Sequence, residues 1–194
     1  MALVCLVGSL MMGEILGGER PVSHDHTVHY FQTWLLKERF WQDGWFFWSN
    51  LWFAGYPANY TYPVGAYFWV LLVHGLTLGT LTLSGAYAVA FWLFFVLHGV
   101  SVYVLGRLAS NRVVGLMAAV LYLVDRGASS AGGWFWTVDI GTWPIAFSIA
   151  WSTIATALLA RILEGGTKRD VVWCAACVGM ALLSHPLQLV YLPI

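Results

Sequence analysis

Residues 81–106 form a long run that contains no Asp, Glu, Lys or Arg. As an α-helix rising 1.5 Å per residue, the run is about 39 Å long, which exceeds the roughly 30 Å hydrocarbon core of a bilayer. Hydrophobic residues make up 60% of the 194 residues and charged residues only 9%, whereas soluble domains carry about 25% charged residues. The chain has too few charges to cover its surface in water, so we expect an integral membrane protein.

The hydropathy pattern defines the expected architecture. Six hydrophobic segments occur at 2–17, 63–79, 81–106, 113–124, 143–163 and 171–194. Because a spanning segment must satisfy its own backbone hydrogen bonds, they predict an all-α membrane protein, a single transmembrane domain over 1–194 with about five to six hydrophobic helices. The first segment is short for a crossing and the last is still hydrophobic where the sequence stops. We therefore expect the N-terminal portion of a longer protein.

Two longer connections, 18–62 and 125–142, are expected on the outer side of the membrane. The short turns near 107–112 and 161–169 are rich in Lys and Arg, and basic turns favour the cytoplasm. This orientation places 125–142 outside. A re-entrant or interfacial segment 63–79 places 18–62 outside as well, and we prefer this because 63–79 is short and glycine-containing. A full crossing by 63–79 would instead put 18–62 in the cytoplasm.

The first outer connection, 18–62, is dense in aromatic residues, which favour the membrane interface. Apolar residues at 28, 31, 34, 35 and 41 follow approximately helical spacing. The charged triplet 37–39 interrupts this stripe. We predict an amphipathic helix over 27–41 that lies on the membrane surface.

Candidate site residues gather in the two outer connections. In the motif Ser23-His24-Asp25-His26-Thr27-Val28-His29, the carboxylate of Asp25 has two compatible interpretations. It is either the N-cap of the helix 27–41 or a general base or metal ligand that faces a substrate.

For a divalent metal ion as cofactor, the candidate ligands are Asp25, His24 and His26. Their spacing matches no strong zinc pattern, and histidines that make ordinary hydrogen bonds are the alternative. The pair Cys174 and Cys177 lies in a hydrophobic segment and is interpreted as packing. A net charge of zero offers no basic surface, so no nucleic-acid partner is expected.

The order of several motifs resembles the GT-C type membrane glycosyltransferases. Within that superfamily it is most similar to bacterial polytopic proteins labelled "6-pyruvoyl-tetrahydropterin synthase related". The resemblance covers about 20–194 and no single motif is specific. The motifs are Asp25-x-x-x-His29, Gly55-Tyr56-Pro57, Tyr62-Pro63, Gly141-Thr142-Trp143-Pro144, the basic turn with Arg161 and Lys168-Arg169, and Leu183-Ser184-His185-Pro186.

The resemblance implies a multi-pass protein of the bacterial inner membrane that transfers a sugar from a polyprenyl-phosphate-linked donor at the outer face. Asp25 would be the acidic residue of the first outer loop, acting as base or metal ligand, and Asp139 is a looser second candidate. From its chemistry, Arg126 is expected to bind a lipid phosphate through its guanidinium fork. The substrate groove is expected to include His29, Tyr56 and Trp136.

Two other functions remain open. The chain is shorter than complete GT-C enzymes, and a non-catalytic structural subunit that binds lipid and other membrane subunits is the main alternative. A transporter is the third, and we rank it last because the sequence shows no convincing internal repeat.

Overall fold

The computed structural model describes residues 1–17, 20–52, 54–60, 64–127 and 133–191. Helices dominate this part of the chain. They are α1 (Ala2–Met11), α2 (His26–Asp43), α3 (Gly65–Leu76), α4 (Leu83–Ala109), α5 (Arg112–Val124), α6 (Trp143–Leu163), α7 (Lys168–Ser184) and α8 (Gln188–Tyr191). A 3-10 turn, Ile15–Gly17, follows α1, and a π-helical turn, Phe135–Asp139, precedes α6.

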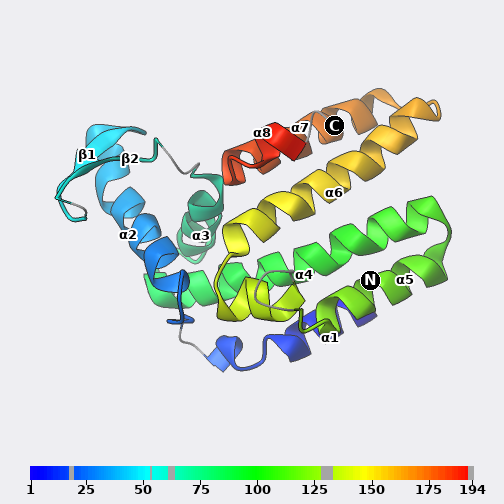
Figure 1. Cartoon of the computed structure of the whole chain (residues 1–194), viewed down its shortest axis with the longest axis horizontal. Coiled ribbons are helices and arrows are strands. Elements are labelled where there is room, and N and C mark those ends of the chain that lie inside the picture. The colour runs from blue at the N-terminus through cyan, green and yellow to red at the C-terminus, as the bar shows by residue number, and fades with distance from the viewer. Residues whose placement is uncertain (18–19, 53, 61–63, 128–132, 192–194) are drawn as a thin grey trace.

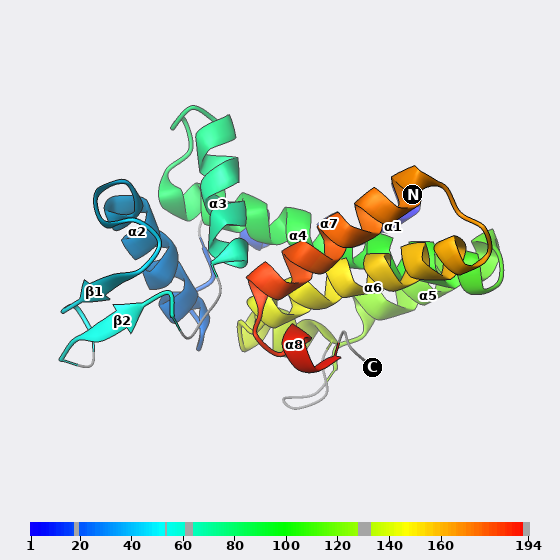
Figure 2. The same ribbon diagram turned by 90° about the horizontal axis from the view of Figure 1, so that it is seen from above.

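The helices form a bundle with two unlike ends. Helices α1, α4, α5, α6 and α7 run side by side, and α4 packs against α1, α3, α5 and α6 (Figure 1). Helices α2 and α3 lie at one end, with α3 transverse to the bundle (Figure 2). This loop end carries 20–60 and 125–142 as far as they are described. The opposite turn end carries the α4–α5 and α6–α7 connections, 110–111 and 164–167.

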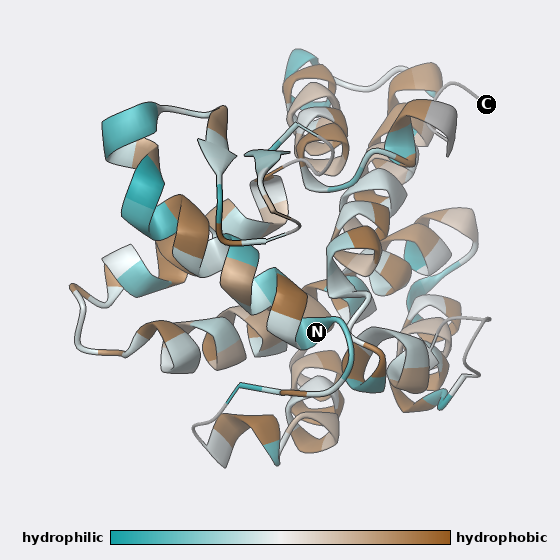
Figure 3. Ribbon diagram, turned by 60° about the vertical axis from the view of Figure 1, so that its left-hand side comes forward, coloured by the Kyte–Doolittle hydropathy of each residue, from teal (hydrophilic) through white to brown (hydrophobic). Residues whose placement is uncertain are grey.

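Two helices, α4 and α6, are long and apolar enough to cross a membrane. Helix α5 is short and packs on α4 and α1, but its opposite face exposes Val113, Met117 and Leu121. Hydrophobic residues recur along the helices of the bundle, whereas hydrophilic residues concentrate on the second half of α2 (Figure 3), and exposed large apolar residues also occur on α1 and α7, such as Leu10 and Val172. Large exposed apolar faces of this kind mark contact with a membrane or with another protein.

Small residues allow the helices to approach closely. A Cβ atom on Gly115 of α5 would lie 2.6 Å from the carbonyl oxygen of Tyr103 on α4. A Cβ atom on Gly65 of α3 would lie 2.6 Å from the carbonyl oxygen of Leu183 on α7. Neither position has room for a side chain, and such small-residue contacts are typical of helix packing in membranes.

The structure agrees with most of the helical segments predicted from the sequence and differs at one short hairpin. The helix predicted over 27–41 is confirmed as α2, and the predicted segment 171–194 breaks after α7 at His185 and Pro186. The expectation of all-α structure is wrong at a short antiparallel hairpin, β1 (Phe47–Ser49) with β2 (Tyr56–Ala58), which pairs Trp48 with Pro57. The hairpin forms because backbone pairing between these short aromatic segments satisfies their polar groups.

Candidate functional site

The two polar segments of the sequence meet at the loop end, although more than one hundred residues separate them. The backbone N–H of Asp25 donates to the carbonyl oxygen of Ile140 at 3.0 Å. The Ser23 hydroxyl donates to the carbonyl oxygen of Asp139 at 2.6 Å, and Nδ1 of His24 lies 3.3 Å from the same oxygen. These bonds tie the approach to α2 onto the π-helical turn that leads into α6.

The buried side chain of His26 holds the two segments of this junction together through hydrogen bonds. Its Nε2 donates to the carbonyl oxygen of Val138 at 2.7 Å, because a carbonyl can only accept. Its Nδ1 therefore accepts from the Tyr87 hydroxyl at 3.0 Å, and that hydroxyl accepts from the Trp143 indole N–H at 2.7 Å. Gly141 has a φ of +86°, and a Cβ atom there would lie 2.8 Å from the His26 backbone nitrogen. A glycine is required at this contact.

The buried histidines of α2 are neutral. Burial lowers the pKa of His26 to about 4, against smaller opposing effects of the Val138 carbonyl and Asp25. Burial, followed by the neighbouring His26 and His185, lowers the pKa of His29 to about 3. The Nδ1 atom of His29 lies 3.1 Å from the Tyr67 hydroxyl on α3. Both rings connect α2 to the bundle through hydrogen bonds.

Asp25 occupies the N-cap position of α2, but the predicted capping bond is absent. Its backbone is helical, with φ −75° and ψ −13°, and its side chain accepts no capping hydrogen bond. A true cap adopts an extended backbone, from which the carboxylate can reach the N–H groups of the first turn. Asp25 is instead exposed, and within the described ranges no hydrogen bond or ion pair engages its carboxylate. The carboxylate is free to face a ligand.

A pocket of about 260 Å³ lies beside this junction, between the 3-10 turn after α1 and the π-helical turn. Two carboxylate residues, Glu14 and Asp139, line it together with Ser23. Arg20, next in sequence to the pocket residue Pro21, has its guanidinium 4.0 Å from the centre of the Tyr30 ring. Its Nη1 atom is buried and has no hydrogen-bond partner in the part of the chain that the structure describes. The pocket thus combines two carboxylate residues and a hydroxyl residue at the loop end of the bundle.

The other predicted site residues are dispersed. Arg126 is exposed where α5 ends, and the half-buried Trp136 accepts hydrogen bonds from Thr142 through its backbone oxygen. Tyr56 lies on β2, where its hydroxyl pairs with the Gln32 side chain of α2. His29 points inward to Tyr67. The structure therefore brings together Asp25, Asp139, His24 and His26, while Tyr56 and His29 serve separate contacts.

The predicted metal ligands do not form a ligand set. Across the described residues, no group of three or more His, Cys, Asp or Glu side chains is placed to hold a metal ion. Both ring nitrogens of His26 are engaged in hydrogen bonds, so it has no free lone pair to offer. The arrangement of His24, Asp25 and His26 fits hydrogen bonding rather than metal coordination.

Sequence reasoning did not place several residues in this site. Glu14 lies near the end of the first hydrophobic segment and is not among the predicted site residues, and Ser23 is only the start of the polar motif 23–29. Tyr87 carried no signal, because a tyrosine inside an apolar helix is usually packing. The Thr142-Trp143-Pro144 motif could have identified Trp143, since proline is favoured in the first turn of a helix and fixes where α6 begins.

Comparison with family models, with curated proteins and with solved structures finds no match for this chain. The chain is therefore described by its structure alone, as a mostly helical protein with two long apolar helices and a polar junction at one end of its bundle.

Proposed function

We propose that this chain is the membrane-embedded portion of a GT-C-like glycosyltransferase, a multi-pass protein of the bacterial inner membrane. The apolar faces of α1, α5 and α7 support placement in lipid, because a water-exposed surface of this kind would be unfavourable. The loop end then lies at the outer face, since the turn end carries Arg107, Arg112, Arg161, Lys168 and Arg169.

The observation that carries the proposal is the junction of 23–26 with 138–141, where the Asp25 carboxylate is exposed and has no hydrogen bond or ion pair with any residue that the structure describes. A free carboxylate at the lipid interface is suited to general-base chemistry. Asp25 accepts the proton of an acceptor hydroxyl, and the oxygen of that hydroxyl forms a bond to the anomeric carbon of the donor sugar. The bond from that carbon to the phosphate oxygen breaks, and polyprenyl phosphate leaves. Arg126 is suited to bind the leaving phosphate through two parallel N–H donors.

The test is an Asp25→Asn variant, assayed for transfer of a radiolabelled sugar from a polyprenyl-phosphate donor in membranes. Loss of the base is expected to reduce transfer by about 10²- to 10⁴-fold at equal protein level. Asp125→Asn is the matched control, because that carboxylate caps the Gly127 N–H at the same end of the bundle. Normal transfer by the Asp25 variant would remove this residue from the mechanism.

A structural subunit of a larger membrane complex is the second candidate. The exposed apolar residues of α5 and α7, among them Met117 and Trp173, could equally contact another membrane protein. Co-purification in fixed stoichiometry with a large complex, without sugar transfer, would favour this function over the first.

A further inference from the structure

A second cavity, at the turn end, has a composition unlike that of the loop-end pocket. It lies between α4 and α6, where the two helices diverge in Figure 1, and has a volume of about 590 Å³. Its walls are apolar and come from both helices, with Val104 and Leu108 on one side and Ile154 and Leu158 on the other. Such a groove has room for a lipid chain between the helices.

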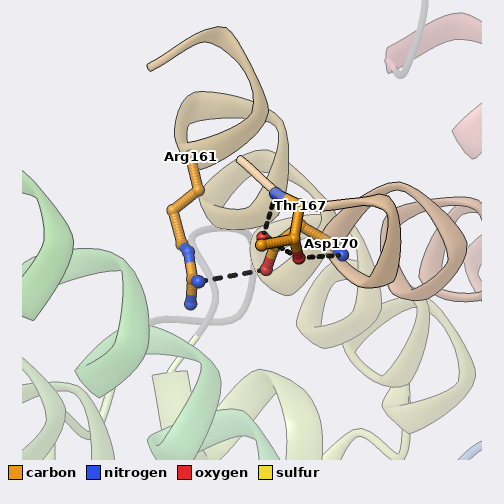
Figure 4. Close-up of polar contacts among 3 residues, drawn as sticks. All are labelled: Arg161, Thr167 and Asp170. Carbon is orange, nitrogen blue, oxygen red and sulfur yellow. Dashed lines mark hydrogen bonds and ion pairs between the residues drawn. The ribbon is translucent and has the colours of Figure 1, made fainter. Parts of the chain in front are cut away.

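Charged residues lie at the end of the groove nearest the α4–α5 and α6–α7 connections, and this end is called the rim. Arg161 is held by Asp170, with Nη2 and Oδ1 3.1 Å apart (Figure 4). The other carboxylate oxygen of Asp170 accepts hydrogen bonds from the Thr167 N–H and hydroxyl, each at 2.8 Å. This capping box fixes the carboxylate and so fixes the guanidinium. One contact to Asp170 leaves most of the five N–H donors of Arg161 available to a ligand.

Arg107 supplies the second cation of the rim. It is exposed, and its side chain has no hydrogen-bond or ion-pair partner among the residues that the structure describes. Glu164 is the acidic residue of the same rim. The turn end as a whole carries five basic residues against two acidic ones, Glu164 and Asp170. Its charge is complementary to an anion.

We propose that this groove binds an anionic phospholipid of the phosphatidylglycerol type. Its acyl chain lies along the apolar walls, its phosphate binds Arg107 and Arg161, and its glycerol hydroxyls donate to Glu164. A free phosphate would not use the apolar walls, and a choline headgroup would meet two guanidinium groups. Basic pockets between membrane helices are suited to acidic headgroups. This inference rests on membrane insertion and is independent of sugar transfer.

The experiment measures lipid that the purified chain retains in mild detergent. The chain is incubated with an equimolar mixture of phosphatidylglycerol and phosphatidylcholine, and bound lipid is counted by native mass spectrometry. We expect selective retention of phosphatidylglycerol. Arg107→Gln should weaken it about fivefold, the effect of one basic residue near a charged headgroup. Arg112→Gln is the matched control, because Arg112 lies at the same end but outside the groove, and it should bind as the parent does.

Two further measurements test the roles of charge and of the acyl chain. Arg107→Lys preserves the charge and should bind within about twofold of the parent. Glycerol 3-phosphate at millimolar concentration should not displace the lipid, because it lacks acyl chains. Equal retention of both lipids, equal losses in the Arg107 and Arg112 variants, or displacement by glycerol phosphate would each overturn the proposal. None of these readouts depends on Asp25, so failure here leaves the transferase proposal standing.

Discussion

The two ends of the bundle handle polar groups in opposite ways. At the loop end, His26 and Tyr87 are buried and bonded to partners far away in the sequence. At the turn end, polar bonds are local, as in the Thr167–Asp170 capping box, and charges such as Arg107 are exposed. The loop end therefore depends on tertiary structure for its geometry, while the turn end is mostly fixed by neighbouring residues. Variants that affect one end and spare the other test this difference.

The largest expected effect is that of removing the central indole at the loop end. Trp143 is 0% exposed, whereas Trp173 on α7 is 54% exposed. Trp143→Ala should cost about 3–5 kcal/mol of unfolding free energy through the cavity it leaves and the lost bond to Tyr87. Trp173→Ala, the matched control, should cost less than about 0.5 kcal/mol. Circular dichroism of unfolding in mixed micelles measures both, and similar losses would contradict the asymmetry.

Acid should destabilise the loop end before the turn end. The pKa of His26 is about 4 in the folded chain and about 6.5 when unfolded, so the unfolded chain binds the proton first. Stability is therefore full above pH 6.5 and is lost as the pH falls toward 4, by about 3 kcal/mol from this group alone. His29, with a pKa of about 3, adds to the loss in the same direction.

Hydrogen exchange between pH 7 and 4 measures this acid effect at each end separately. His26→Gln should reduce the pH dependence, because a glutamine side chain can donate to the Val138 carbonyl without binding a proton at these pH values. An unchanged acid profile in that variant would show that His26 is not the titrating group. Earlier exchange at the turn end would reverse the expected order.

Removing one hydroxyl should have an intermediate effect. Tyr87→Phe leaves His26 Nδ1 and the Trp143 indole N–H without their partner, which should cost about 1–3 kcal/mol. Tyr103→Phe is the control, since the Tyr103 hydroxyl has no hydrogen bond within the described residues. The same unfolding measurement compares them, and equal costs would indicate that the loop-end network contributes little.

The smallest expected effect concerns the cap of α7. Thr167 accepts the Asp170 N–H through its hydroxyl, and Thr167→Ala should cost about 1 kcal/mol. Because this bond is local, hydrogen exchange should increase only in the first turn of α7. Thr82, which caps α4 by accepting the Gly85 N–H, is the loop-end counterpart. Increased exchange at His26 in the Thr167 variant would show coupling between the two ends.

Local sequence patterns are sufficient to locate most of the helical segments and the position of α2. Apolar runs predict helices because each helix satisfies its own backbone, and such runs located α4 and α6. The helical spacing of apolar residues located α2. It also indicated that polar chemistry gathers in 23–29 and 125–142. A histidine deep in an apolar helix predicts a hydrogen bond to a neighbouring helix, and Nδ1 of His98 on α4 lies 2.8 Å from the Tyr122 hydroxyl on α5.

The way in which those polar segments combine depends on how the helices pack. Helix packing brings Asp25 to Ile140 and His26 to Val138, and it leaves Asp25 without its predicted capping bond. These features depend on how α1, α4 and α6 fold around one another. The hairpin of β1 and β2 likewise depends on backbone pairing across a loop. Sequence periodicity reports local preferences, whereas hydrogen bonds between residues a hundred positions apart depend on helix packing, which a single sequence does not display.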